Sequence, residues 1–364
     1  MAYVTPWKYS TGTYSRGRLD EAGENARQEV ATNEDREILN NWRGAHLYVI
    51  NTFQANLRGR RKRLGANITI AQRLKRMPTI TDKLRRQPKM AMSRMHDIAG
   101  CRLIFENIDE LSDFRTRVLK TRAKHELLSG EDKYNYIARP KSSGYRGVHD
   151  VYKYVADRAT GAEWDGLRIE IQYRTKVQHA WATAVEISDI VHSSRVKFSQ
   201  GAENIEEFFT LCSELLARRW EARTGPLPDA SETHLLSRIA EIDQEHRLLQ
   251  SLTSASSAQT FQIARSFRLF ILINIFEGAE KGNTKVIPLA DSEVALSRYR
   301  QLEDEYAGTA DVVLVGAQEN DALKLAYTNY FSDAKIFLEL LASARHPVRA
   351  SQPVVSKKRL PLSD

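Results

Sequence analysis

This chain has few cysteines and no long apolar run. One long segment also has almost no acidic residues. The two cysteines, Cys101 and Cys212, lie far apart in apolar contexts. We therefore expect buried free thiols rather than a disulfide or a metal site. No run of about 18 apolar residues occurs, so no membrane span is expected. The basic N-terminal residues are not followed by an apolar stretch, which argues against a secretory signal. These absences together predict a cytoplasmic protein.

Acidic residues are nearly missing from residues 58–94. This segment contains thirteen Lys or Arg and one acid, Asp82, which gives a net charge of +12 (13 − 1). Like charges at this density repel one another unless an anion neutralises them. The segment therefore predicts an anionic partner, either nucleotide phosphates or nucleic acid.

The order of the expected elements divides the chain into domains. Residues 35–223 read as helix, strand, helix, strand, strand, helix, which predicts an α+β domain with a mixed sheet flanked by helices. Residues 1–34 are expected to be loose, and the segment around 224–231, with two prolines and a glycine, is expected to be a linker. Residues 232–346 predict a second, smaller α+β domain, and 347–364 a disordered tail.

Periodicity predicts the individual elements. In the first domain we expect helices from residue 35, over 70–84 (interrupted by Pro78), from Ser112 and over 177–192, and strands at 98–107, 149–157 and 167–175. In the second domain we expect helices over 234–252, 294–306 and 322–344, and strands over 267–276, 285–290 and 311–317.

One expected strand carries polar side chains on one face. In RIEIQYRT, alternation directs Glu170, Gln172 and Arg174 to the same side. A wet face of an antiparallel sheet explains such a pattern without any function. A second carboxylate, Asp97, precedes the neighbouring apolar strand, however. Two carboxylates together with substrate phosphates are a usual way of holding Mg²⁺, so Asp97 and Glu170 are candidate metal ligands.

The stretch RPKSSGYRGVH, residues 139–149, has the composition of a loop that contacts a nucleotide. Lys141, Arg146 and His149 can donate to phosphate oxygens, and Gly144 allows a close backbone approach. Tyr145 offers a flat ring on which a base could stack. A packed core tyrosine is the alternative for Tyr145.

Four motifs, in order, resemble the synthetase domain of the RelA/SpoT family, which makes the alarmones ppGpp and pppGpp. The motifs are RLKRMPTITDKL (73–84), HDIAGCRLIF (96–105), RPKSSGYRGVH (139–149) and EIQYRTKVQHAWA (170–182). The resemblance implies a nucleotidyltransferase-like, synthetase-only member and a pyrophosphokinase that moves the β,γ-pyrophosphate of ATP to the ribose 3′-OH of GDP or GTP. The chain departs from the family pattern at Gly147, where serine is common, and at Asn135, where an acid is usual.

The resemblance also implies a role for each matching residue. Asp97 and Glu170 would be catalytic and would hold Mg²⁺. ATP would contact Arg73, Lys75, Lys83 and Arg102. The acceptor would contact Lys141, Ser143, Tyr145, Arg146, His149, Gln172, Arg174 and His179.

Two other functions remain open. Some small members of the family pyrophosphorylate the 3′ end of tRNA, and residues 58–94 would then bind the tRNA backbone. A non-catalytic nucleotide- or RNA-binding regulator is the other alternative, although the presence of both Asp97 and Glu170 argues against it. The second domain carries eleven basic and sixteen acidic residues over 232–345, so it could cover residues 58–94 as a lid that an effector lifts, or it could serve packing or self-association.

Overall fold

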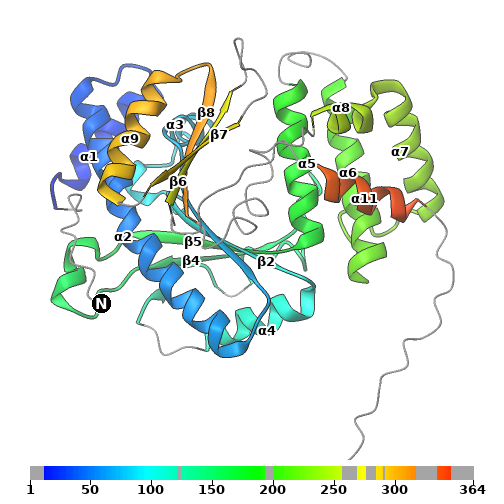
Figure 1. Cartoon of the computed structure of the whole chain (residues 1–364), viewed down its shortest axis with the longest axis horizontal. Coiled ribbons are helices and arrows are strands. Elements are labelled where there is room, and N and C mark those ends of the chain that lie inside the picture. The colour runs from blue at the N-terminus through cyan, green and yellow to red at the C-terminus, as the bar shows by residue number, and fades with distance from the viewer. Residues whose placement is uncertain are drawn as a thin grey trace, which may run out of the picture.

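The structure is a computed structural model. It describes residues 12–120, 124–130, 132–192, 201–255, 269–275, 284–289, 292–316 and 334–345. These residues form a sheet with its covering helices and, beside it, a cluster of helices (Figure 1).

One eight-stranded mixed sheet is the framework of the molecule. Its order is β3-β4-β5-β2-β1-β8-β6-β7. The strands are β1 (Thr69–Leu74), β2 (Ala99–Phe105), β3 (Glu126–Leu127), β4 (Val148–Lys153), β5 (Arg168–Thr175), β6 (Leu269–Ile275), β7 (Thr284–Leu289) and β8 (Ala310–Gly316). Only the β2–β5 pair is parallel. The predicted α+β class with a mixed sheet is confirmed.

Helix α2 (Asn33–Leu64) covers one face of this sheet. A capping box between Thr32 and Asp35 starts the helix, and Gly65 ends it in the left-handed conformation. Its apolar side chains, among them Ile38 and Ile50, pack into the same core as Ile171 and Tyr173 of β5. The amide of Gln72 in β1 donates to Asn51 of α2 (3.4 Å), which identifies the face that α2 covers.

The remaining helices form two groups (Figure 1). The first group lies with the sheet and comprises α1 (Arg16–Arg27), α3 (Met77–Arg86), α4 (Ile108–Leu119) and α9 (Ser292–Glu305), with the short 3-10 turns Met92–Arg94 and Ala159–Trp164. The second group comprises α5 (Lys176–His192), α6 (Gly201–Glu221), α7 (Glu232–His246), α8 (Leu248–Ala255) and α11 (Lys335–Ala344). This helical group has its own apolar core, which includes Trp181, Phe209 and Phe337.

The three strands expected for the second α+β domain lie in the same sheet as the strands of the first. Strand β8 pairs with β1 (Gln72↔Gly316, Arg73↔Val315), so β8, β6 and β7 extend the first sheet. Helix α11 packs in the helical core instead. The physical reason is that β1 otherwise has a free edge, whose backbone groups pair with any strand that can reach it. The predicted domain boundaries themselves stay predictions.

Three local expectations need correction. Residues 70–84 form β1 followed by α3, with Pro78 in the first turn of the helix, rather than one interrupted helix. Helix α1 occupies part of the segment expected to be loose. The expected linker is fastened to α6: the Glu214 carboxylate accepts from the backbone of Gly225 and Leu227 (2.8 and 2.7 Å).

Smaller differences concern helix ends. Helix α4 begins after Asn107 instead of Ser112, and the helix expected over 234–252 is broken at Arg247, which adopts the left-handed conformation. Helix α6 was not predicted. The expected tail, 347–364, lies outside the described residues, as does most of the N-terminal half of the helix expected over 322–344.

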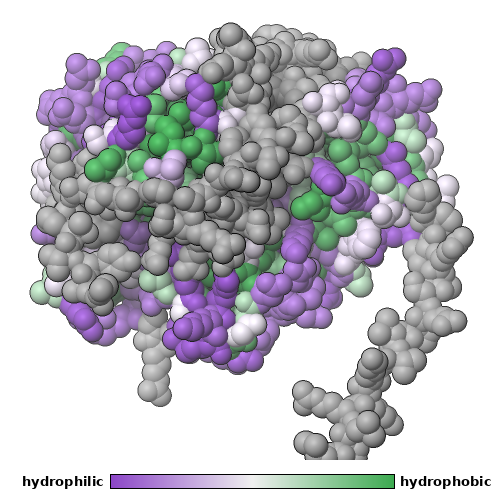
Figure 2. All heavy atoms as spheres, viewed as in Figure 1, coloured by the Kyte–Doolittle hydropathy of each residue, from purple (hydrophilic) through white to green (hydrophobic). Residues whose placement is uncertain are grey.

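The described surface is mainly hydrophilic in the view of Figure 2, with apolar side chains gathered beside α9 and α11. Val294 of α9 and Ile336 of α11 are among the exposed large apolar residues of the described chain. Among the helices that the structure describes, none has both the length and the apolar character to cross a membrane.

Candidate active site

Strand register brings most of the predicted site residues to one face of the sheet. Opposite Gly100 in β2 lie Arg73 of β1 and Glu170 of β5. Two residues further along β2, Arg102 lies opposite Gln172 of β5, and Gln172 lies opposite His149 of β4. Paired residues of neighbouring strands point to the same side of a sheet. This face is the opposite of the one covered by α2, since Gln72 and Arg73 alternate along β1.

Asp97 lies just before β2 and is held by two lysines. Its carboxylate accepts from Lys75 Nζ (2.9 Å) and from Lys83 Nζ (2.8 Å). Burial disfavours the charged form, but the two ammonium groups outweigh burial and lower the pKa of Asp97 to about 2. The Asp97 carboxylate is therefore ionised at neutral pH, and it forms one cluster with Lys75 and Lys83.

Glu170 is held by a histidine, His149, and by an amide, Gln172. His149 Nδ1 lies 2.9 Å from Oε1, and the Gln172 amide donates to Oε2 (2.6 Å). Burial acts to raise the pKa of Glu170, and so does the charge of Asp97, but His149 outweighs both and the pKa falls to about 2. The effect of Asp97 on this pKa indicates that the two carboxylates are close enough to interact.

A chain of polar contacts extends from Glu170 into the 139–149 loop. His149 Nε2 lies 2.5 Å from the Tyr145 hydroxyl, which accepts from Arg174 Nε and Nη2 (3.2 and 3.0 Å). Burial acts to lower the pKa of His149, but Tyr145 and Glu170 raise it to about 9. His149 is therefore an imidazolium at neutral pH and ties the acceptor-side residues to Glu170.

Arg146 does not join this constellation. Its side chain is 2% exposed and forms an ion pair with Glu221 of α6, and its Nε donates to Ser213 (3.2 Å). The expectation that Arg146 lines an acceptor pocket is therefore corrected, because a carboxylate from α6 already neutralises this guanidinium.

Gly144 also has a packing role rather than the expected anion-binding one. It has φ +87°, and a Cβ there would lie 2.8 Å from Trp181 and 3.1 Å from Thr210. The loop needs glycine at this position because it packs closely against α5 and α6.

The other predicted acceptor residues lie around Tyr145 in different degrees of burial. Lys141 is exposed, with Nζ 4.4 Å from the Tyr136 ring centroid and 5.2 Å from that of Tyr145. Ser143 is half-buried, whereas His179 is buried in α5. Tyr136, which the sequence analysis missed, contacts the rings of both Tyr145 and His149 edge-on. The repeated tyrosines of KYNYIARP were the available signal.

The donor set can be tested against Mg²⁺. No group of three or more His, Cys, Asp or Glu side chains suited to a metal occurs in the described part of the chain. Asp97 and Glu170 offer carboxylate oxygens, the ligand type that Mg²⁺ prefers, and one or two carboxylates suffice where phosphates complete the shell. The two residues therefore fit a phosphate-bound Mg²⁺, and they do not form a protein cage for a free ion.

Comparison with known proteins agrees with the motifs. Residues 72–191 match the family model described as the region found in RelA/SpoT proteins. GTP pyrophosphokinase YjbM of Bacillus subtilis is 32% identical over 132 residues, which are 36% of this chain and 57% of that protein. GTP pyrophosphokinase YwaC of the same organism is 32% identical over 116 residues, 30% of this chain and 52% of its own. The chain thus spans little more than half the length of these relatives.

A solved structure is similar over a longer range. The small alarmone synthetase 1 from B. subtilis bound to its product pppGpp matches with a TM-score of 0.42 and 21% identity, over 56% of this chain and 95% of that chain. The family match begins in β1 and ends in α5, and so contains Asp97, Glu170 and the 139–149 loop. Residues 72–191 thus match the region found in RelA/SpoT proteins, and the chain is similar in sequence to YjbM and YwaC over part of its length.

Proposed function

We propose that this protein is an alarmone synthetase that transfers the β,γ-pyrophosphate of ATP to the ribose 3′-OH of GDP or GTP. The observation that supports the proposal is the pair of carboxylates, Asp97 just before β2 and Glu170 in the adjacent strand β5, with different surroundings on its two sides. Lys75 and Lys83 flank Asp97, whereas His149 and Gln172 flank Glu170. Such a pair can have one anionic substrate bound on each of its two sides.

The donor side is suited to a triphosphate. Arg73 and Arg102 share the face of the sheet with Glu170, and Lys75 and Lys83 supply two further cations. When ATP is bound, these cations would stabilise the charge that develops on the phosphoryl oxygens. Asp97 and Glu170 would hold Mg²⁺, which when bound would neutralise part of the same charge.

In the reaction, the acceptor 3′-oxygen bonds to the β-phosphorus of ATP. The bond between that phosphorus and the oxygen bridging to the α-phosphorus breaks, AMP leaves with the bridging oxygen, and the hydroxyl proton is released. Glu170 would orient the hydroxyl and accept its proton. Because its pKa is about 2 in the free protein, we assign orientation as its larger contribution, which agrees with the positioning that dominates such transfers.

On the acceptor side, the Tyr145 ring lies next to the cationic side chains of Lys141 and Arg174. Tyr145 would stack on the acceptor base, which is worth about 1–3 kcal/mol. The ring is already in contact with Lys141, so the lysine side chain would move aside or cover the base when the acceptor binds.

The alternative tRNA acceptor gains no support from the α2 terminus. Arg61, Lys62 and Arg63 form the last turn of α2, which packs on the opposite face of the sheet. The test is incubation of the purified chain with Mg²⁺, γ-labelled ATP and GDP, GTP or tRNA. We expect labelled guanosine products and an equal amount of AMP. Label in tRNA alone would favour the alternative, and no product with any acceptor would contradict both.

A further inference from the structure

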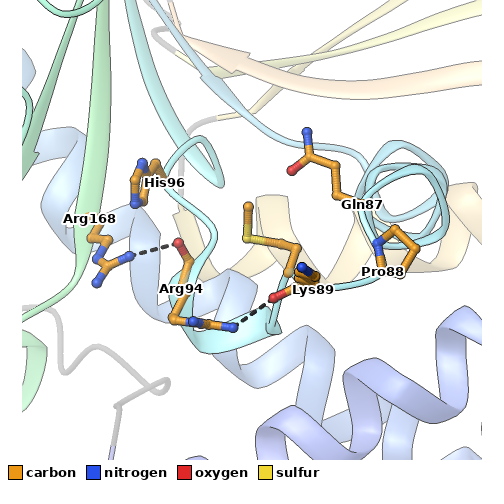
Figure 3. A pocket seen from close by; sticks show the side chains of 7 residues that line it. Gln87, Pro88, Lys89, Arg94, His96 and Arg168 are labelled. Carbon is orange, nitrogen blue, oxygen red and sulfur yellow. Dashed lines mark hydrogen bonds between the residues drawn. The ribbon is translucent and has the colours of Figure 1, made fainter.

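A cavity of about 590 Å³ lies beside the two carboxylates and takes no part in the assignments above. Its lining comes from the segment between α3 and β2 and from the start of β5 (Figure 3). The lining residues are Gln87, Pro88, Lys89, Met90, Arg94, His96 and Arg168. The volume is in the range of small-molecule sites.

The lining is cationic and contains no carboxylate. Arg168 Nη1 donates to the backbone carbonyl of Arg94 (2.7 Å), and Arg94 Nη2 donates to that of Lys89 (2.7 Å). Carbonyl oxygens fix the guanidinium groups in place without neutralising them. Over the described ranges, Lys89, Arg94 and Arg168 form no ion pair with a carboxylate. Burial lowers the pKa of Arg168, and repulsion from Arg16 and Arg94 lowers it further, as expected where cations gather without an anion.

The position of the cavity relates it to the site. Arg168 lies two residues before Glu170 on β5 and therefore on the same face. His96 directly precedes Asp97. The acceptor-side residues Gln172 and Arg174 lie in the opposite direction along β5. The cavity is thus at the far end of the site from Tyr145, beyond the two carboxylates.

The neighbouring cavity shows where this cationic surface ends. It has about 230 Å³ and shares Lys89, Met90 and Arg94, but its lining also includes Asp20 and Glu24. Asp20 accepts from the backbone and hydroxyl of Ser93 (2.8 and 2.9 Å), and Glu24 pairs with Arg27. An anion is therefore favoured only on the Arg168 side.

From this geometry we propose that Lys89, Arg94 and Arg168 form a phosphate subsite that binds the end of a nucleotide's polyphosphate chain. The inference rests on the proposed function, because it requires a nucleotide held at Asp97 and Glu170. Phosphate fits this subsite since guanidinium groups held apart in fixed orientations can each donate to different oxygens of one phosphate group. The phosphates belong either to the donor triphosphate or to the 5′ end of the acceptor.

The first experiment measures binding of inorganic tripolyphosphate to the full chain by calorimetry. We expect about tenfold weaker binding for Arg94→Ala and for Arg168→Ala, the scale of a lost charge-assisted hydrogen bond. Lys89→Ala provides a variant at an exposed side chain in case Arg168→Ala does not fold. Arg117→Ala is the matched control, since it removes one positive charge from an exposed position of α4 that does not line the cavity.

Unchanged tripolyphosphate affinity in a folded Arg94→Ala/Arg168→Ala variant would overturn the proposal. An equal loss in Arg117→Ala would also overturn it, because net charge alone would then explain the effect. Neither result depends on turnover. If the wild type makes no alarmone but the double variant loses tripolyphosphate binding, the proposed function is refuted and the subsite is still supported.

The second experiment identifies the source of the phosphates. Binding of ATP, AMP, GTP and GMP to the wild type and to the double variant is compared. If the donor occupies the subsite, the variant loses affinity for ATP but keeps its affinity for AMP and for GTP. If the acceptor occupies it, GTP is affected and ATP is not. No change for either triphosphate would contradict the subsite, whatever the activity.

Discussion

The donor side and the acceptor side of the site are braced by different later parts of the chain. On the donor side, Arg73 of β1 pairs with Val315 of β8, and Glu303 of α9 accepts from the backbone of Met77 (3.3 Å). On the acceptor side, Glu221 of α6 pairs with Arg146, and Ser213 donates to the carbonyl of Gly144 (2.6 Å). The two sides of the proposed site are thus stabilised by separate sets of contacts, and each can be disturbed on its own.

The two carboxylates differ in the same way. Asp97 is held by Lys75 and Lys83, and its pKa is lowered to about 2. Glu170 is held by His149, whose charge is lost as the pH rises through about 9. The Asp97 carboxylate therefore stays ionised at neutral and alkaline pH, whereas the charge of the group that holds Glu170 depends on pH. The four predictions below test this difference, beginning with the largest expected effect.

Deletion of residues 226–364 should remove the donor-side brace and uncover the helix that carries the acceptor-side brace. It would leave the edge of β1 unpaired and would uncover apolar side chains of α5 and α6 that pack against Phe337 and Leu341. We expect an insoluble fragment, measured as the soluble fraction after expression, with the full chain as control. A soluble fragment with raised synthesis would instead support the expectation of a removable regulatory lid.

Glu170→Gln should abolish transfer and leave the fold intact. The amide is nearly isosteric, but it has no negative charge for a metal or for the attacking hydroxyl, so we expect a loss of at least about 10²-fold in kcat. Glu126→Gln, at an exposed position of an edge strand, is the control. Turnover near that of the wild type, with an unchanged melting temperature, would refute the assignment.

Glu303→Gln and Glu221→Gln should separate the two braces. The pair of Arg146 and Glu221 has side-chain exposures of 2% and 3%, and that of Arg43 and Glu303 of 0% and 13%. Removing one charge of a buried pair costs about 3–5 kcal/mol, so both variants should melt earlier. Glu303→Gln should raise KM for ATP more than KM for the acceptor, and Glu221→Gln should do the reverse. Equal effects on both constants would contradict the separation.

His149 should titrate near pH 9, measured from its ring proton shifts by NMR. Because the folded-state pKa is raised above the ordinary 6.5, its contribution to stability is complete below about pH 6.5 and is lost as the pH rises through 9. Tyr145→Phe removes one of the two contacts of the imidazole and should lower the midpoint, whereas Tyr136→Phe, which keeps its ring contact, should not. A wild-type midpoint near 6.5 would contradict the coupling to Glu170.

The sequence predicted those parts of the fold whose signal is local. The alternation in RIEIQYRT predicted β5, and the apolar run before Glu106 predicted β2. Both signals are local, because each strand buries at least every second residue. The prediction failed at β1, whose apolar residues are spaced closely enough to read as a helix that continues into α3. The strand forms there because β2 and β8 supply hydrogen bonds on both of its edges.

The motifs located the carboxylates and their cations for the same reason, since Asp97, Lys75 and Lys83 lie within 22 positions of one another. They could not reveal that Arg146 turns away from the site, because its partner Glu221 lies 75 positions further along the chain. Nor could they reveal the cavity beside Arg168. Arg168 shares the face of Glu170 on β5, but the other walls of the cavity come from the segment between α3 and β2.

The sequence by itself determined the kind of chemistry: two carboxylates, a surplus of cations and an aromatic acceptor loop, each encoded within a short motif. The tertiary structure decided which charges stay available to a substrate. Arg146 is neutralised by α6. Within the described residues, Arg94 and Arg168 donate to backbone carbonyl oxygens, and neither they nor Lys89 form an ion pair with a carboxylate. A charge is free or paired according to what the rest of the chain packs against it, because Coulomb energy depends on distance in space and not on separation along the chain.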